Sequence, residues 1–400
     1  MKRTYDFAVI GAGVFGAWTA RYLRQAGASV VILDAYGPGN SRSSSGGETR
    51  IIRAGYGPDE LYTRWAIRSF PLWQEFFERV GRDFFRRTGV LWLGDEADPH
   101  VSQIPALLAR LGVQCEKLSA AEISRRYPQL HFAEVTLGVL EPQSGVLLAR
   151  DAVQALVMEL AADGVEYLTA AVQPPRGRGK LLALETKATK ATEAAEATRA
   201  TGAGQRSVSA GTFIFTCGSW LPKLFPELLG ELIFATRQEV FFLGPPAGSD
   251  AFHAPRMPAW LHHTHPDRPY ALPDIENRGF KIALDRHGPE FDPDHGSRVV
   301  SAAAADHVRG YLAQHVPALA HAPVVETRVC QYENTWNGDF LLDRHPDFDN
   351  VWLAGGGSGH GFKHGPVVGE YLSARILNNA AAEPRFSLAS KQTRKARSVY

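Results

Sequence analysis

The hydrophobic positions at the start of the chain follow first a strand pattern and then a helix pattern. The apolar run 7–10 is followed at once by GAGVFG and then by AWTARYLRQAG, whose apolar residues recur at helical spacing up to Gly27. A second apolar run, 29–33, ends in Asp34. This pattern predicts a buried parallel strand, a glycine turn, a helix that ends near Gly27 and a second parallel strand.

The same two patterns recur along the rest of the chain. They predict helices over 59–80, 151–164 and 366–379, and strands over 87–94, 165–172, 211–218 and 351–356. Asp151 is the expected N-cap of the second of these helices. The last strand ends in glycines and leads into a helix, so we expect the first and last strand–turn–helix units to share one sheet.

The glycines after the first strand have the spacing G-x-G-x-x-G, which is typical of dinucleotide binding. Gly11 permits a tight turn, Gly13 lets the backbone approach a pyrophosphate, and Gly16 lets helix and strand pack closely. The helix N-terminus attracts phosphate, and the carboxylate of Asp34 can accept hydrogen bonds from a ribose diol. The motif leaves open whether the nucleotide is FAD or NAD.

The composition is that of an ordinary soluble enzyme. Of the 400 residues, 44% are hydrophobic and 21% are charged, and the net charge of +1 favours neither nucleic acid nor an anionic membrane as a partner. No apolar run reaches the ~18 residues of a membrane span, and the N-terminus has no signal-peptide pattern. Cys115, Cys217 and Cys330 cannot all pair, so we expect a reducing, cytoplasmic location.

Three polar stretches differ in the chemistry that their residues allow. In 37–57, Arg50 and Arg53 flank an apolar pair and are candidates for binding an anion near the glycine turn. Residues 187–206 are a low-complexity Ala, Thr, Lys and Glu segment, which we expect to be a surface insertion without a catalytic role. The histidines of HHTHP, 262–266, lack a second ligand cluster at metal-site spacing, so no metal is predicted.

Seven blocks, in the same order along the chain, resemble the sarcosine oxidase and pipecolate oxidase family of the D-amino acid oxidase superfamily. The blocks are VIGAGVFGAW, TRIIRAGYG, RRTGVLWLG, EPQSGVLL, GFKIALDRHGPEFDPD, CQYENTWNGDFLLDRHP and SGHGFKHGPVVGE. The resemblance implies an α/β fold of two domains, a Rossmann-like FAD-binding domain and an inserted mixed β-sheet domain for the substrate. The implied FAD-binding domain comprises 1–90, 145–225 and 325–385, and the substrate domain comprises 91–144 and 226–324.

The resemblance also implies FAD as the cofactor, tethered by a thioether from Cys330 to the flavin 8α-methyl group. From its own surroundings in the sequence, Cys330 can equally be a small buried hydrophobe. The residues that the resemblance places at the cofactor are Gly11, Gly13, Gly16, Asp34, Arg50, Val172, Cys330, Gly357, Gly359, His360 and Lys363.

Five further matches concern substrate and oxygen. Arg53 and Lys363 match a pair that grips the substrate carboxylate, since two cations facing one carboxylate give charge-assisted hydrogen bonds. Lys281 matches a lysine at the flavin face where oxygen is reduced, although a solvent-facing strand lysine fits the local pattern as well. Tyr270 and Tyr332 match aromatic residues that line the substrate pocket, although ordinary packed tyrosines fit both positions equally.

The chain departs from its relatives near the expected flavin. Residues 44–47, SSGG, stand where many relatives have histidines, and Asp285 stands where the sarcosine enzymes have an active-site histidine. The resemblance therefore implies a monomeric FAD-dependent oxidase of a secondary or N-methylated amino acid, without assigning sarcosine itself. Its products would be an imine, which water hydrolyses to a carbonyl compound and an amine, and hydrogen peroxide.

Three alternatives stay open at the level of the sequence. An FAD-dependent dehydrogenase would pass its electrons to a quinone or a carrier protein instead of oxygen. An NAD-linked dehydrogenase could use the same first strand–turn–helix unit, and it would be colourless. A nucleotide-binding protein without turnover would hold a flavin that no amine reduces.

Overall fold

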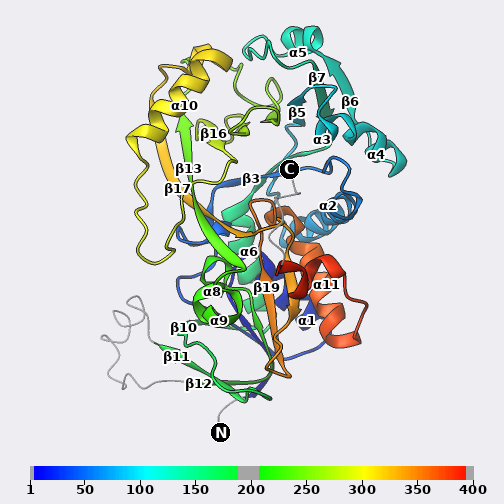
Figure 1. Ribbon diagram of the computed structural model, residues 1–400, viewed down its shortest axis with the longest axis vertical. Coiled ribbons are helices and arrows are strands. Elements are labelled where there is room, and N and C mark those ends of the chain that lie inside the picture. Colours follow the sequence, from blue (N-terminus) through cyan, green and yellow to red (C-terminus); the bar gives the residue numbers. More distant parts are fainter. Residues whose placement is uncertain (1–3, 188–206, 393–400) are drawn as a thin grey trace.

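The structure, a computed structural model, describes residues 4–187 and 207–392. Apart from Lys187, the predicted insertion 187–206 therefore lies outside the described residues. Two eight-stranded sheets dominate the described part of the chain, one in the lower half of Figure 1 and one in the upper half. A third sheet, of three strands, accompanies them.

The lower sheet contains β1 (Thr4–Ile10), β2 (Val30–Asp34), β9 (Glu166–Thr169), β10 (Ala171–Val172), β11 (Ala183–Lys187), β12 (Ser207–Phe215), β18 (Leu341–Arg344) and β19 (Val351–Gly355). The upper sheet contains β5 (Val90–Gly94), β6 (Glu116–Ser119), β7 (Leu137–Glu141), β13 (Ile233–Leu243), β14 (Ala259–His262), β15 (Pro269–Leu272), β16 (Phe280–Leu284) and β17 (Val324–Thr335). The third sheet contains β3 (Thr49–Ile52), β4 (Phe85–Arg86) and β8 (Gly145–Leu148).

The helices are α1 (Val14–Gln25), α2 (Glu60–Val80), α3 (Pro99–Ser102), α4 (Ile104–Arg110), α5 (Ala120–Arg126), α6 (Ala149–Ala162), α8 (Leu221–Leu224), α9 (Pro226–Leu229), α10 (Ala302–His315) and α11 (Gly365–Asn378). Short 3-10 turns include η1 (Ser44–Gly46) and η4 (Phe362–His364).

Parallel pairing joins the start and the end of the chain in the lower sheet. β1 pairs with β2 on one side and with β12 on the other, and β12 pairs in turn with β19. The prediction that the first and last strand–turn–helix units share one sheet is therefore confirmed. The carboxyl ends of these strands meet at one edge, where open α/β sheets bind their ligands.

Alternate residues of the lower sheet enter two different cores. Val9 and Ile32 pack in the core that contains the apolar faces of α1, α6 and α11, whereas Ala8 and Val31 pack in a core on the opposite face. All four side chains are fully buried. Burial on both faces explains why these strands appear in the sequence as continuous apolar runs.

Several predicted elements differ from the structure in detail. The strands predicted over 87–94 and 211–218 are β5 (Val90–Gly94) and β12 (Ser207–Phe215). The helix predicted over 151–164 begins at Ala149, so Asp151 lies in its first turn and is not the N-cap, which is Leu148. Asp151 still favours the helix, because a negative charge in the first turn interacts well with the helix dipole. The strand predicted over 165–172 is two strands, of which β9 pairs with β2 and β10 pairs with β11.

In the upper sheet, helix α10 covers one face and the other face turns toward the functional site. Along β16, Phe280 and Ile282 share a core with Leu312 of α10. Lys281 points to the opposite face, beside Phe242 of β13, because side chains alternate along a strand.

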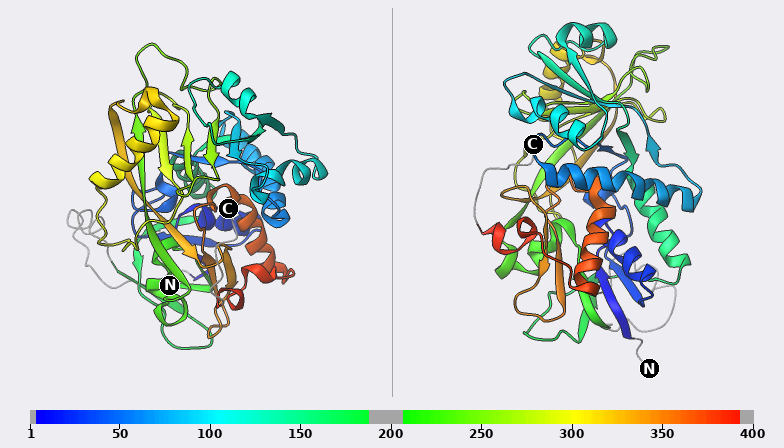
Figure 2. Two further views of the ribbon diagram at one scale, coloured as in Figure 1. Left: turned by 45° about the horizontal axis from the view of Figure 1, so that its top comes forward. Right: turned by 90° about the vertical axis from the view of Figure 1, so that its right-hand side faces the viewer.

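Helix α2 crosses the junction between the lower and upper halves, as the right-hand view of Figure 2 shows. It contacts α11 and α6 of the lower half. The helix begins after Asp59, whose side chain accepts a hydrogen bond from Tyr62 N, and it ends at Gly81 in the left-handed conformation. The helix predicted over 59–80 is therefore confirmed.

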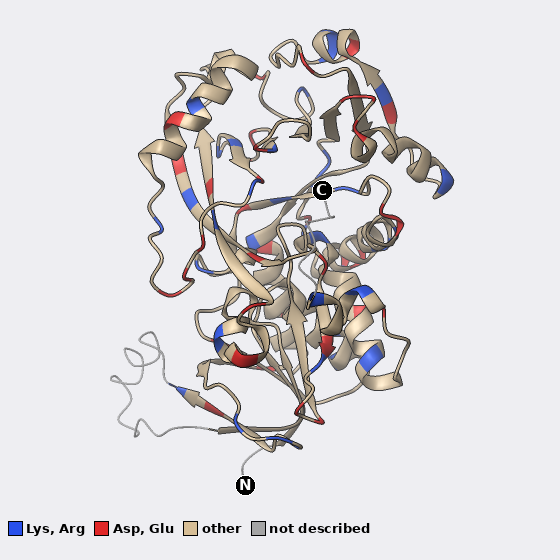
Figure 3. Ribbon diagram, viewed as in Figure 1, with Lys and Arg blue, Asp and Glu red and all other residues tan. Residues whose placement is uncertain are grey.

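The domain boundaries implied by the resemblance stay a prediction. Strand β17, which they assign mostly to the FAD-binding part, pairs with β13 in the upper sheet. Figure 3 shows basic and acidic residues interspersed over both halves. Among the residues that the structure describes, no helix combines the length and the apolar character that crossing a membrane requires.

Candidate functional site

A cavity of about 490 Å³ lies at the carboxyl edge of the lower sheet. Gly11, Thr216 and Gly357 follow the ends of β1, β12 and β19 and form part of its wall. Most of the predicted cofactor residues line this cavity, namely Gly11, Gly13, Asp34, Arg50, Val172, Cys330, Gly357 and Gly359. Residues far apart in the sequence thus converge where a doubly covered parallel sheet is expected to bind its ligand.

The glycine turn has the shape that phosphate binding requires. Gly11 adopts a φ of 111°, which L side chains rarely adopt. A β-carbon at Gly16 would lie 2.0 Å from the carbonyl oxygen of Gly11, so only glycine permits this contact between helix and turn. Gly13 is the N-cap of α1, and a β-carbon there would meet only Ser45 Oγ, at 3.4 Å, so the remaining space is open. This open turn at a helix N-terminus fits a pyrophosphate.

Asp34 ends β2 at the wall of the larger cavity. Its Oδ2 accepts a hydrogen bond from Ala12 N at 2.8 Å, and its Oδ1 accepts from Tyr36 N at 2.8 Å and from Gly37 N at 2.9 Å. Burial raises the pKa of Asp34 above its ordinary value, and the three backbone donors oppose that rise. The backbone bonds hold the carboxylate in place, and a carboxylate has a further lone pair for a ribose hydroxyl.

Cys330 lies where the larger cavity meets a smaller one, since it lines both. The cysteine is buried in β17, and Arg50 Nη2 donates a hydrogen bond to its Sγ at 3.6 Å. The same guanidinium group donates to Ser44 O at 2.6 Å and to Thr49 O at 2.7 Å, which hold it beside the sulfur. The Cys330 sulfur thus faces both cavities with one guanidinium group fixed beside it.

The smaller cavity has a volume of about 70 Å³ and lies against the upper sheet. The residues predicted to act on substrate and oxygen all line it, namely Arg53, Tyr270, Lys281, Tyr332 and Lys363. It shares with the larger cavity the residues Arg50, Cys330, Tyr332, Gly359 and Phe362. A molecule in the smaller cavity would therefore lie next to a molecule in the larger one.

Arg53 and Lys363 place two buried cations at the wall of the smaller cavity. The Arg53 Cζ lies 4.2 Å from the ring centroid of Trp92 and 4.4 Å from that of Tyr56. Lys363 Nζ donates to His360 O at 3.0 Å. Burial, and next the charge of Arg53, hold the pKa of Lys363 well below its usual range. A bound anion would relieve this repulsion, and a substrate carboxylate is such an anion.

Glu141 of β7 fixes the turn that follows β3. Its carboxylate accepts hydrogen bonds from Ala54 N at 2.7 Å and Gly55 N at 3.0 Å. It also accepts from Trp92 Nε1 at 2.9 Å and Ser144 Oγ at 2.7 Å, and the residue is only 1% exposed. No sequence motif indicated this role, because the four donors come from three separate segments.

Replacing Glu141 by Gln is expected to lower the free energy of unfolding by about 2–3 kcal/mol, because one amide oxygen cannot serve four buried donors. Urea unfolding monitored by circular dichroism measures the loss. The matched control is Ser144→Ala, which removes one of the donors and should cost about 1 kcal/mol. Equal losses for the two variants would contradict the role given to Glu141.

Lys281 is buried on the face of β16 that lines the smaller cavity. Its Nζ donates to Thr49 O at 2.9 Å and to Thr49 Oγ1 at 3.2 Å. Burial, and next the charge of Arg50, lower the pKa of Lys281 to about 7. A solvent-facing lysine, the alternative left open by the sequence, is therefore wrong for this position. A buried ammonium group here can stabilise an anion that forms inside the cavity.

Polar side chains of the upper sheet complete the smaller cavity. Tyr332 Oη donates a hydrogen bond to Asp285 Oδ1 at 3.0 Å. Burial raises the pKa of Tyr270 to about 12, so its hydroxyl stays protonated at neutral pH. Asp285, for which the resemblance implied a histidine, is thus a hydrogen-bonded acceptor in the cavity wall.

Three predicted cofactor residues lie outside the wall of the larger cavity. Gly16 packs against Gly11, whereas His360 and Lys363 line the smaller cavity. His360 Nε2 donates to Gly338 O at 3.0 Å, because a carbonyl oxygen can only accept. The assignment of these three residues to the cofactor stays a prediction.

Some cavity residues were missed by the sequence analysis. Ser45 Oγ accepts from Val14 N at 3.1 Å and so caps α1 from the loop that precedes β3. Thr216 follows a parallel strand directly, which is a signal that could have identified it. Glu333 is buried, its Oε1 has no hydrogen-bond partner in the described part of the chain, and burial raises its pKa to about 7. This unpaired oxygen suits a polar group of a ligand in the larger cavity.

Known proteins with a similar sequence or structure identify the family. The family profile DAO, FAD dependent oxidoreductase, matches residues 6–375. Peroxisomal sarcosine oxidase of Mus musculus is 30% identical over 379 residues, which cover 92% of this chain and 91% of that protein. Monomeric sarcosine oxidase of Arthrobacter sp. (strain TE1826) is 29% identical and covers 93% of this chain and 92% of its own length. The solved structure of L-proline dehydrogenase from P. horikoshii has a TM-score of 0.80 and 20% identity, and it covers 99% of this chain and 100% of that chain.

These similarities confirm the resemblance that the seven sequence blocks indicated, and the structural likeness confirms the two-domain α/β fold class. The matched range contains both cavities, so the nucleotide is FAD and the NAD-linked alternative is wrong. The glycine turn, Asp34 and the unpaired Glu333 oxygen provide residues that fit such a cofactor. The chain belongs to the sarcosine oxidase-like members of the FAD dependent oxidoreductase family.

Proposed function

We propose that this protein is an FAD-dependent oxidase of a secondary or N-methylated amino acid and that it releases hydrogen peroxide. The observation that carries the proposal is the pair of buried basic side chains, Arg53 and Lys363, in a cavity that adjoins the larger cavity. The names of the relatives give sarcosine, an N-methylated amino acid, as their substrate. A carboxylate anchored by the two cations would hold the amine near the shared wall.

The roles of the side chains follow from their charges and positions. Arg53 and Lys363 would bind the substrate carboxylate and so orient the carbon next to nitrogen. Tyr270, Tyr332 and Asp285 line the same cavity and would contact the rest of the substrate. Burial of the cavity would keep bulk water away from the substrate. When bound, FAD supplies the acceptor for the hydride and passes the electrons on. Lys281 would stabilise the negative charge that develops when oxygen is reduced.

A screen for peroxide tests the proposal. The purified yellow protein is mixed in air with N-methylated and cyclic amino acids, and peroxide is measured together with oxygen consumption. Peroxide formed in equal amount to the oxygen consumed supports an oxidase. Cofactor reduction by a substrate without peroxide, but with turnover on a quinone analogue, would favour the dehydrogenase alternative instead.

Cys330 is proposed to tether the FAD through a thioether, with Arg50 as the cation beside the sulfur. Acid precipitation of the wild-type protein should therefore carry the yellow colour into the pellet, and the intact mass should include the flavin. Cys330→Ser should release all colour into the supernatant. Cys115→Ser is the matched control, since Cys115 lines neither cavity and should keep the adduct. Colour in the wild-type supernatant would contradict the tether.

Two further properties are proposed with the function. One relative is named a monomeric sarcosine oxidase, and we expect this chain to be a monomer as well. The cytoplasmic location expected from the three cysteines stays a proposal. The expected partners are a small amino acid or amine substrate and molecular oxygen. Light scattering of the purified protein measures the molar mass in solution, and a dimer mass would contradict the first expectation.

A further inference from the structure

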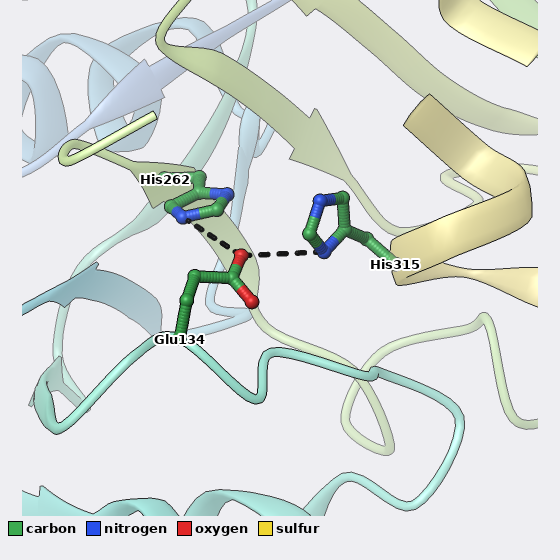
Figure 4. Close-up of side chains that lie close together, drawn as sticks. All are labelled: Glu134, His262 and His315. Carbon is green, nitrogen blue, oxygen red and sulfur yellow. Dashed lines mark ion pairs between the residues drawn. The ribbon is translucent and has the colours of Figure 1, made fainter. Parts of the chain in front are cut away.

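Outside both cavities, two histidines and a glutamate from three separate segments converge in the upper half of the molecule (Figure 4). Glu134 lies between α5 and β7, His262 ends β14, and His315 ends α10. Glu134 Oε1 is 3.4 Å from His262 Nε2 and 3.5 Å from His315 Nδ1. All three atoms lie within 4.8 Å of one another.

We propose that Glu134, His262 and His315 form a binding site for one zinc ion. Zinc is bound by nitrogen and oxygen at about 2.0–2.2 Å, and tetrahedral angles then place neighbouring ligand atoms about 3.3–3.5 Å apart. The two distances to Glu134 Oε1 match this spacing. Two imidazoles and one carboxylate suit zinc, whereas calcium and magnesium prefer oxygen ligands alone.

The environment of His262 points to a ligand. The residue is 1% exposed, and its Nε2 has no hydrogen-bond partner among the described residues although it faces Glu134. Its other ring nitrogen, Nδ1, lies 3.0 Å from Tyr311 Oη. When Nδ1–H donates to that oxygen, the lone pair of Nε2 faces the cluster, which is how metal-binding histidines are usually oriented.

His315 is also held in position by its surroundings. Its ring stacks on Phe132, with centroids 5.3 Å apart and planes 19° apart, and Phe132 contacts the His262 ring edge-on. His315 Nδ1–H donates to His131 O at 3.0 Å, so zinc would displace this proton and this hydrogen bond. In a neutral imidazole the displaced proton moves to the other ring nitrogen, Nε2, so zinc binding would change the tautomer of His315.

The fourth coordination position can be filled from solvent. The Glu134 side chain is 49% exposed, so the cluster is open to water on that side. A bound ion would fasten the segment before β7 to β14 and to the end of α10, and it would thus stabilise the upper sheet.

A second acidic cluster with a histidine provides a comparison. Asp292, Asp294 and His295 also lie within ligand distance of one another. There, Lys223 Nζ already lies 2.6 Å from a carboxylate oxygen of each aspartate, so a cation of the protein itself neutralises the cluster. His295 therefore serves as a matched control for the loss of a histidine outside the proposed site.

A zinc titration tests the proposal. The FAD-loaded, tag-free protein is first treated with a chelator and dialysed, and zinc is then added. Calorimetry should show that one zinc ion binds per chain with saturation. Glu134→Gln should lower the affinity for zinc at least about tenfold. It should also abolish the rise in the thermal unfolding temperature that zinc causes in the wild type. His295→Ala should change neither the affinity for zinc nor the rise in unfolding temperature that zinc causes.

Glu134 is half exposed, so Glu134→Gln should fold, and unchanged flavin absorbance would verify this. His315→Gln is the second variant, which removes a nitrogen ligand and should give the same loss. Absence of saturable zinc binding in the wild type would overturn the proposal. So would zinc binding that Glu134→Gln and His315→Gln both leave unchanged.

Discussion

Arg53→Met is expected to lower kcat/KM for an N-methylated amino acid by about 10³-fold, because removing one partner of a buried, hydrogen-bonded charge pair costs about 2–5 kcal/mol. The variant leaves Lys363 as the single cation of the pair, and a lone point charge cannot give the bidentate contact of a guanidinium group. Steady-state peroxide assays at varied substrate concentration measure the loss. Most of it should appear in KM, since the carboxylate is bound equally in the ground state and the transition state.

Two controls separate carboxylate binding from damage to the fold. Arg64→Met removes an arginine from the exposed face of α2, where the side chain is 59% exposed, and should leave kcat/KM unchanged. An amine that is identical to the substrate but lacks the carboxylate should react equally slowly with wild type and Arg53→Met. A 10³-fold loss on that amine as well would show that Arg53 does not act through the carboxylate.

Lys281→Met is expected to slow the reaction of the reduced protein with oxygen by about 10²–10³-fold, which is the usual effect of removing one preorganised electrostatic group. The reduction of the protein by substrate should change by less than about threefold, because no anion forms at Lys281 in that half-reaction. Stopped-flow absorbance measures the two half-reactions separately. Equal slowing of both would contradict the role in oxygen reduction.

The pH dependence gives a second test of Lys281. Burial lowers its pKa from 10.5 to about 7, so the ammonium charge is lost as pH rises through about 7. The rate of reaction with oxygen should therefore fall above that pH in the wild type, and Lys281→Met should show no such fall. Between pH 7 and 10.5 the unfolded chain binds the proton that the folded chain has lost, so this lysine makes the protein more stable as pH rises there.

The residues around the glycine turn show how much local sequence can determine. Gly11, Gly13 and Asp34 belong to one strand–turn–helix–strand unit, and their positions follow from backbone geometry over residues 7–34. The same holds for the buried strands of the lower sheet, because both faces are covered and the apolar runs are continuous. The nucleotide-binding unit was therefore predictable from local sequence, whereas FAD, the family and the two-domain fold class were implied by the resemblance of seven sequence blocks.

The direction of the Lys281 side chain could not be read from the sequence. Phe280 and Ile282 are both apolar, so alternation along β16 gave no preference between solvent and cavity. The covering of one face by α10 decided it, since that helix buries Phe280 and Ile282 and leaves Lys281 on the face of the site. Burial of a strand residue depends on what packs against the sheet, which lies elsewhere in the chain.

Contacts between distant segments could not be predicted from the sequence either, because they depend on the tertiary structure. Arg50 and Cys330 were each identified from the sequence, but only the folded chain places Arg50 Nη2 of β3 at 3.6 Å from Cys330 Sγ of β17. Glu141 and the cluster around His262 were missed, because their partners are carried by strands and loops far away in the sequence. The strand–turn–helix–strand unit over 7–34 could be predicted from the sequence because it depends on short-range backbone geometry. The tertiary structure decided which charges meet, since a charge pair depends on distance in space and not along the chain.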